Sequence, residues 1–243
     1  MPRFFVNKEN ICDGSVIIGA PDSTHISRSL RMAVGDEISV SDGEGKDYIC
    51  RLTKIRDEEC TAEIINALAS LESPVAVTLF MAMPKGDKLE VIVQKAVELG
   101  AVRIVPFESE RCIKRPSGDK IEKLTARLSR IALEAAKQCG RSVVPAVEPM
   151  TRLADVCAAL PQFDLALLCY EAEKENSIKH ALLSSPNAKS ICVIVGSEGG
   201  FSPSEAERLV SAGASAVTLG RRILRCETAP DYVLSVLSYY YEM

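Results

Sequence analysis

The chain has 243 residues, 47% of them hydrophobic, and a formal net charge of −4 at pH 7. This length and composition suit a protein with a sizeable buried core, and the acidic balance argues against indiscriminate nucleic-acid binding while leaving room for a local basic surface. No apolar stretch is long enough to span a bilayer, the first residues do not form a signal peptide, and the 9 cysteines include no C-x-x-C pair, so we expect a cytoplasmic protein with reduced thiols and no membrane attachment.

The first part of the chain predicts a small β-rich module. It lacks long helical periodicity and carries short alternating runs between turn signals, as at 38–43 and 48–52. The texture changes after Glu72-Ser73-Pro74, so we place a domain boundary there. We expect a first domain over 1–72 and a second over 73–243.

The second part alternates strand and helix patterns. Asp87 and Asp119 each precede a run with apolar residues on one helical face. Strand-like apolar runs lie at 75–83, 102–107, 165–169, 191–195 and 216–219. This alternation predicts an α/β domain with a mainly parallel sheet.

Two glycine-bearing segments near the C-terminus, 195–203 and 219–230, each follow a strand-like run and precede a helix signal. In the first, Ser202 can cap a helix in which Pro203 occupies the first turn and Glu205 completes a capping box. In the second, Thr228 is the expected cap. Loops at the carboxyl ends of parallel strands form a crevice in which open α/β sheets bind ligands, so we expect the active site there.

The glycines match neither G-x-x-x-x-G-K-[ST] nor G-x-G-x-x-G, which disfavours a conventional Rossmann site for a dinucleotide or methyl donor. A sharp turn is a sufficient reason for any single glycine. The density of charge favours a functional site, because loops between buried elements rarely need so much charge for packing. The charged residues in question are Glu198, Arg221, Arg222, Arg225 and Glu227.

These two segments resemble the signature of the SPOUT class of S-adenosylmethionine-dependent RNA methyltransferases. More narrowly, they resemble the bacterial 16S ribosomal RNA (uracil-N3)-methyltransferases, whose pattern is a G-P-E-G-G-hydrophobic loop followed by L-G-x-R-I-L-R-x-E-T-A. Residues 94–100, 109–111 and 134–141 also fit, so the resemblance extends over nearly the whole chain. One departure is Ser197, where the family usually has proline; it loosens the loop slightly and leaves every polar contact available.

The resemblance implies a PUA-like, RNA-binding β-barrel for the first domain and a C-terminal trefoil knot for the second. It implies an enzyme that methylates uridine N3 in 16S ribosomal RNA of the small ribosomal subunit, without a metal, and that takes part in ribosome biogenesis. S-adenosyl-L-methionine would lie in the knot. The implied cofactor-binding residues are Leu168, Cys169, Tyr170, Val195, Gly196, Glu198, Gly199, Gly200, Leu219, Gly220, Ile223, Leu224, Thr228 and Ala229.

For catalysis, the target uridine must be unpaired and lose its N3 proton. We expect Arg225 to stabilise the resulting negative charge, with Glu227 orienting Arg225 or accepting a proton; a structural salt bridge between the two is the alternative. Cys226 could act as a nucleophile for methylation at carbon 5, but the family pattern leaves its position open, and we interpret it as a small apolar residue. The two histidines, His25 and His180, are not expected to act as bases.

RNA contacts are assigned to basic residues in or beside predicted loops, although without the family a solvated surface would explain most of them. They are Arg3, Arg28, Arg31, Lys85, Arg111, Arg141, Arg221 and Arg222.

Two other functions stay open. A SPOUT enzyme that methylates a ribose 2′-hydroxyl in transfer RNA is disfavoured by the β-rich N-terminal module, and a catalytically silent RNA-binding factor is disfavoured by the intact glycine loops. The terminal segment 232–241 is apolar almost all round and ends in three tyrosines, so part of it must be covered. Together with the resemblance, this predicts a symmetric homodimer whose interface includes that helix and residues 199–201.

Overall fold

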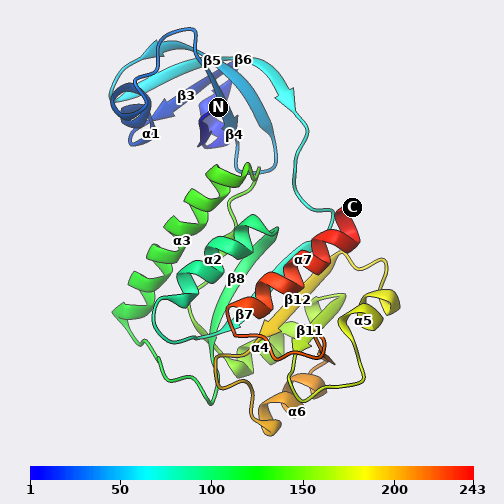
Figure 1. Ribbon diagram of the computed structural model, residues 1–243. Helices are drawn as coiled ribbons and strands as arrows, with labels where there is room; N and C mark the ends of the chain where they lie inside the picture. The colour runs from blue at the N-terminus through cyan, green and yellow to red at the C-terminus, as the bar shows by residue number, and fades with distance from the viewer. The chain divides into compact units, whose positions relative to one another are not determined.

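The computed structural model describes residues 1–243, which form two compact units (Figure 1). The first unit comprises Met1–Glu72 together with Ala136–Val144, and the second comprises Ser73–Ala135 and Pro145–Met243. The sequence did not predict that residues 136–144 belong with the first unit. No helix in the structure has the length and apolar character needed to cross a membrane.

The first unit is built on a six-stranded sheet with the order β1-β4-β5-β6-β3-β2. Neighbouring strands are antiparallel except β1 and β4, which are parallel. The strands are β1 (Arg3–Phe5), β2 (Ile11–Cys12), β3 (Ser15–Gly19), β4 (Glu37–Ser41), β5 (Asp47–Ile55) and β6 (Glu59–Leu68). Within residues 1–72, helical structure is limited to α1 (Asp22–Thr24) and single turns at Lys8–Asn10 and His25–Ser29. The predicted β-rich module is therefore confirmed.

Alternating residues of these strands form the core of the first unit. Val16 and Ile18 of β3 are buried with Ile38 and Val40 of β4, while Ile17 between the first two is exposed. In β3 this is the period-2 pattern of a strand with one buried face, whereas β4 is buried at four consecutive residues. Most apolar side chains of this core come from the strands of the sheet.

Buried ion pairs attach residues 141–142 to this unit. The side chains of Arg3 and Asp47, 9% and 3% exposed, form an ion pair of 2.6 Å, and Asp47 also accepts a hydrogen bond from Ser142 Oγ at 2.6 Å. Arg141 Nε donates to Glu72 Oε2 at 2.8 Å, and the Arg141 side chain is 7% exposed. The assignment of Arg3 and Arg141 as RNA-binding residues is therefore wrong for this structure, because both guanidinium groups are buried against carboxylates.

The second unit contains a seven-stranded sheet in which every pairing is parallel. The order is β10-β8-β7-β12-β11-β13, and β9 also pairs with β8. The strands are β7 (Ala76–Ala82), β8 (Ala101–Glu108), β9 (Ala146–Val147), β10 (Thr151–Arg152), β11 (Leu165–Cys169), β12 (Ser190–Val195) and β13 (Ser215–Val217). The central strands β7, β12 and β11 are buried almost throughout, which explains their continuous apolar sequences.

Helices connect these strands, as the alternating pattern predicts. They are α2 (Lys88–Glu98), α3 (Asp119–Cys139), α4 (Leu153–Ala159), α5 (Ile178–Ser184), α6 (Pro203–Ser211) and α7 (Thr228–Glu242). Figure 1 shows α7 across β12 and beside α2, and α7 contacts both of these elements. The helices α4 and α6 contact each other and the sheet.

The two predicted helix caps have different outcomes. Ser202 caps α6 in a capping box with Glu205, as predicted, and Glu205 is only 4% exposed. The prediction that Thr228 caps α7 is wrong, because Thr228 is already the first helical residue and Glu227 takes the cap position without a side-chain capping bond. The Glu227 carboxylate is instead engaged by Lys88.

The chain itself covers one face of α7. Val233, Leu234 and Leu237 are buried, whereas Tyr232 and Tyr239 are 41% and 72% exposed. Phe201, which we expected at a subunit interface, is 2% exposed and stacks on Phe107 with ring centroids 6.3 Å apart. Its side chain is therefore part of the intrachain core.

Candidate active site

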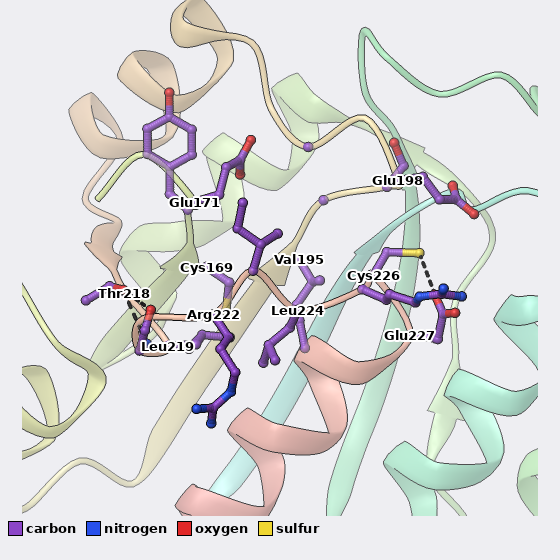
Figure 2. A pocket seen from close by; sticks show the side chains of 18 of the residues that line it. Cys169, Glu171, Val195, Glu198, Thr218, Leu219, Arg222, Leu224, Cys226 and Glu227 are labelled. Atoms are coloured by element: carbon purple, nitrogen blue, oxygen red, sulfur yellow. Dashed lines mark hydrogen bonds between the residues drawn. The ribbon is translucent and has the colours of Figure 1, made fainter. Parts of the chain in front are cut away.

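The carboxyl ends of β11, β12 and β13 open into one pocket of about 610 Å³ (Figure 2). Since β11 lies between β12 and β13 and all three are parallel, the segments that follow them meet at one edge of the sheet. The lining residues are Lys88, 169–171, Lys174, 195–200, 217–227 and Ala229. Both glycine-bearing loops thus contribute to one site, as the sequence predicts.

Nearly all the predicted cofactor-binding residues line this pocket. The exceptions are Leu168, which is fully buried inside β11, and Thr228, whose position in α7 is exposed. Three charged lining residues, Lys88, Glu171 and Lys174, are not among the predicted site residues. The sequence places Lys88 at the start of the helix that follows β7. It does not show that β7 pairs with β12, and this pairing is what brings Lys88 to the pocket.

The glycine loop between β12 and α6 is tightly folded. The Gly200 N–H donates to the Ser197 carbonyl oxygen at 2.9 Å, and Gly200 has φ +63°, a conformation that side chains with a Cβ rarely adopt. A Cβ at Gly200 would also overlap the carboxylate of Glu171, and one at Gly196 would lie 3.1 Å from the Cα of Gly200. These glycines therefore provide both the turn and the space in the pocket wall.

Lys88 connects the two loops through their carboxylates. Its Nζ lies 3.1 Å from Oε1 of Glu198 and 3.0 Å from Oε2 of Glu227. The main-chain N–H of Lys85 also donates to both oxygens of Glu198 at 3.2 Å. One end of the pocket is therefore a connected cluster of one ammonium group and two carboxylates.

These contacts set the ionisation of the cluster. The hydrogen bond with Lys88 is the main cause that lowers the pKa of Glu227 from 4.5 to about 2. Burial, and then the hydrogen bond from Cys226 Sγ to Glu227 Oε2 at 3.2 Å, raise the pKa of Cys226 to about 12. At neutral pH Glu227 is an ionised, very weak base, and Cys226 is a neutral thiol that is poorly suited to nucleophilic attack.

Arg225 lines the pocket but does not pair with Glu227. The ion-pair partner of Glu227 is Lys88, and Arg225 is exposed. The expectation that Glu227 orients Arg225, and the alternative of a salt bridge between them, are both wrong for this structure. The guanidinium of Arg225 is left free to meet a group that enters the pocket.

The other predicted RNA-binding residues lie at the surface. Arg28 forms an ion pair with Asp57, and the Nη1 of Arg111 donates to the Gly199 carbonyl oxygen at 2.8 Å. Arg31, Lys85, Arg221 and Arg222 are exposed, and the last two line the pocket.

Comparison with known proteins agrees with this geometry. Residues 71–238 match the family described as RNA methyltransferase domain, and residues 18–65 match the RNA methyltransferase PUA domain. The ribosomal RNA small subunit methyltransferase E of Bacillus subtilis is 34% identical and aligns with 100% of this chain and 98% of its own length. The protein of the same name from Synechocystis is 32% identical over 97% of this chain and 77% of its own.

A solved structure is similar over the same length. The ribosomal RNA small subunit methyltransferase E of Neisseria gonorrhoeae, bound to S-adenosyl methionine, is 32% identical, has a TM-score of 0.85, and covers 99% of this chain and 98% of its own. Its similarity includes both the first unit and the parallel-sheet unit that carries the pocket. With a family match over residues 71–238 and full-length relatives at more than 30% identity, the chain belongs to the RNA methyltransferase family.

Proposed function

We propose that this protein transfers the methyl group of S-adenosyl-L-methionine to N3 of a uridine in 16S ribosomal RNA of the small ribosomal subunit. The main support is that both glycine-bearing loops of the (uracil-N3)-methyltransferase signature line one pocket. The full-length similarity to proteins named ribosomal RNA small subunit methyltransferase E supports the same substrate.

The pocket residues fit this cofactor. A volume of about 610 Å³ lies in the range of small-molecule sites, and the glycine loops let the main chain approach a ligand closely. The Ser197 hydroxyl is buried without a hydrogen-bond partner in the pocket wall. We assign the adenine to the main-chain groups of 219–224, with Val195 and Leu224 as apolar walls. When bound, S-adenosylmethionine supplies a methyl group already activated on a sulfonium, so the protein need not create an electrophile.

The chain's own contribution is to align the acceptor and to stabilise charge. Uridine N3 carries a proton at neutral pH, and its removal leaves negative charge on the uracil ring. We assign Arg225 to that charge, because its guanidinium lines the pocket without an ion-pair partner. We assign Glu227 the role of ion-pair partner to Lys88. Its low pKa makes it a poor acceptor of the N3 proton.

RNA binding is assigned to the exposed basic residues of both units. In the first unit, which we propose to be an RNA-binding PUA-like domain over 1–72, these are Arg28 and Arg31. In the second unit they are Lys85, Arg111, Arg221 and Arg222. Phosphate contacts of this kind position an RNA without reading its sequence.

We further propose a cytoplasmic, metal-independent homodimer with a trefoil knot in the second unit. The support for the dimer is the exposed side of α7, where Tyr232, Tyr239 and Tyr240 are 41%, 72% and 36% exposed. Tyrosine is enriched at protein interfaces because it offers apolar area and a hydroxyl. Light scattering at micromolar concentration tests this: a mass of one 26.3 kDa chain in a fully active sample would exclude the dimer.

Nucleoside mass spectrometry of ribosomal RNA tests the function. Deletion of the gene should remove 3-methyluridine from small-subunit RNA, and the wild-type gene, but not the Arg225→Ala variant, should restore it. If 3-methyluridine persists and a different modified nucleoside disappears, the target is not uridine N3.

A further inference from the structure

The cluster at one end of the pocket has an unequal number of charges. Lys88, Glu198 and Glu227 all line the cavity, and the single ammonium group lies within 3.1 Å of one oxygen of each carboxylate. Figure 2 shows Glu198 and Glu227 on the same side of the pocket as Cys226, with Thr218 and Leu219 on the other side. Two carboxylates and one ammonium leave one net negative charge.

Neighbouring groups do not cancel this charge. The thiol of Cys226 is neutral, because burial and the hydrogen bond with Glu227 raise its pKa to about 12. The N–H of Lys85 that donates to Glu198 is an uncharged main-chain group. The other basic side chains that line the pocket are exposed and form no ion pair with Glu198 or Glu227; they are Lys174, Arg221, Arg222 and Arg225.

Both carboxylates stay ionised although their side chains are partly shielded from solvent. The side chains of Glu198 and Glu227 are 26% and 27% exposed. Burial raises the pKa of Glu198, but main-chain hydrogen bonds and Lys88 lower it by more. One ammonium group does not compensate two carboxylates in full, so the cluster keeps a net negative charge beside a cavity.

We propose that the Glu198–Lys88–Glu227 cluster distinguishes S-adenosylmethionine from S-adenosylhomocysteine by charge. This inference rests on the cofactor assigned under the proposed function. The substrate form carries a positive sulfonium, whereas the product form is a neutral thioether, because the methyl group leaves without the electron pair that binds it to sulfur. The net negative charge of the cluster attracts the sulfonium form and has no such attraction for the neutral thioether. The cluster therefore favours loading of the methyl donor and release of the spent cofactor.

Calorimetric titration of the purified full-length protein measures this discrimination as the ratio of the Kd for S-adenosylhomocysteine to the Kd for S-adenosylmethionine. Glu198→Gln and Glu227→Gln each remove the net charge, so the ratio should fall by about fivefold. Lys88→Met makes the cluster more negative, so the ratio should rise, and Lys88→Arg should leave it unchanged. Sinefungin, which carries a protonated amine in place of the sulfonium, should follow S-adenosylmethionine in every variant.

The Kd ratio should fall in the two glutamate variants and rise in Lys88→Met, and this difference in direction distinguishes charge discrimination from a structural role. If the cluster only held the loops together, all these variants would weaken both ligands equally, and the proposal would be wrong. Glu207→Gln, an exposed position on α6 outside the pocket, is the matched control and should leave the ratio unchanged.

Two further outcomes are decisive. Since charge attraction is screened by salt, the ratio for the unmodified protein should fall as ionic strength rises, and this needs no variant to fold. A ratio independent of salt would contradict the proposal. If neither ligand bound the unmodified protein, the proposed cofactor itself would be wrong and the inference with it, whereas equal binding of both ligands would overturn only the inference.

Discussion

The ammonium nitrogen of Lys88 lies 3.0 Å from Oε2 of Glu227, although 139 residues separate the two in sequence. Lys88 begins α2, and Glu227 directly precedes α7, the helix that packs beside α2. The ion pair thus joins the start of α2 to the second glycine-bearing loop. Any change in its strength should affect both the pocket and the packing of the C-terminal helix.

The first prediction concerns the acid stability that this pair supplies. The pKa of Glu227 is lowered from 4.5 to about 2 in the folded protein, first by the hydrogen bond with Lys88. A lowered pKa contributes stability that is complete above the unfolded value and is lost as the pH falls towards the folded value. Glu227→Gln should therefore reduce the free energy of unfolding by about 1 kcal/mol at neutral pH, and the difference from wild type should shrink below about pH 4.5. Urea unfolding from neutral pH down to about pH 3 checks this; a difference that stays constant with pH would contradict it.

The second prediction separates two effects of a glycine. Gly200 and Gly213 have φ of +63° and +110°, so an alanine at either position strains the backbone and should cost about 1 kcal/mol of stability. Gly200 lines the pocket, where an added Cβ would displace the exposed carboxylate of Glu171, whereas Gly213 lies outside the pocket and nothing lies near its added Cβ. Gly200→Ala should weaken S-adenosylmethionine binding by about tenfold or more, and Gly213→Ala should leave it unchanged in the same calorimetric titration. Equal loss of affinity in both variants would mean that the effect comes from global destabilisation.

Local signals in the sequence predicted local structure well. The capping box of Ser202 and Glu205 involves residues three apart, and the apolar run 191–195 lies within one strand, so each could be recognised without knowing the fold. The two glycine loops could be assigned to one pocket because both follow strands of a predicted parallel sheet. The family resemblance supplied the chemistry, which periodicity alone does not contain.

Contacts between distant residues could not be predicted in this way. Lys88 reaches the pocket because β7 pairs with β12, and Arg3 of β1 forms its buried ion pair with Asp47 of β5, two strands away in the sheet. The sequence does not distinguish a basic loop residue that binds a phosphate of RNA from one that forms an ion pair with a carboxylate of the same chain. That is why Arg3 and Arg141 were assigned to RNA, and why residues 136–144 were not recognised as part of the first unit.

The third prediction tests the catalytic assignment. Arg225 lines the pocket without an ion-pair partner, so Arg225→Ala should leave the Kd for S-adenosylmethionine within about twofold and lower kcat by about 100-fold. Cys226→Ala should keep most of the activity, since the Cys226 thiol has a pKa raised to about 12 and is a poor nucleophile at neutral pH. Turnover on small-subunit RNA, measured beside calorimetry, distinguishes the two variants. If Cys226→Ala were the inactive one, the reaction would proceed through covalent attack on the pyrimidine ring.

The last prediction concerns the buried arginines of the first unit. The ion pair of Arg3 with Asp47 is almost fully shielded from solvent, and the Nε of Arg3 also donates to the Arg141 carbonyl oxygen at 3.0 Å. Removing one partner of a buried pair leaves the other charge without compensation, which costs about 3–5 kcal/mol. Arg3→Ala should therefore lower the free energy of unfolding by about that amount, measured by urea denaturation. Arg31→Ala is the matched control, because Arg31 is exposed and its loss should change stability by less than about 0.5 kcal/mol while weakening RNA binding. If Arg3→Ala instead kept its stability and lost affinity for RNA, Arg3 would have to leave its ion pair to contact the substrate, and its assignment as an RNA-binding residue would be restored.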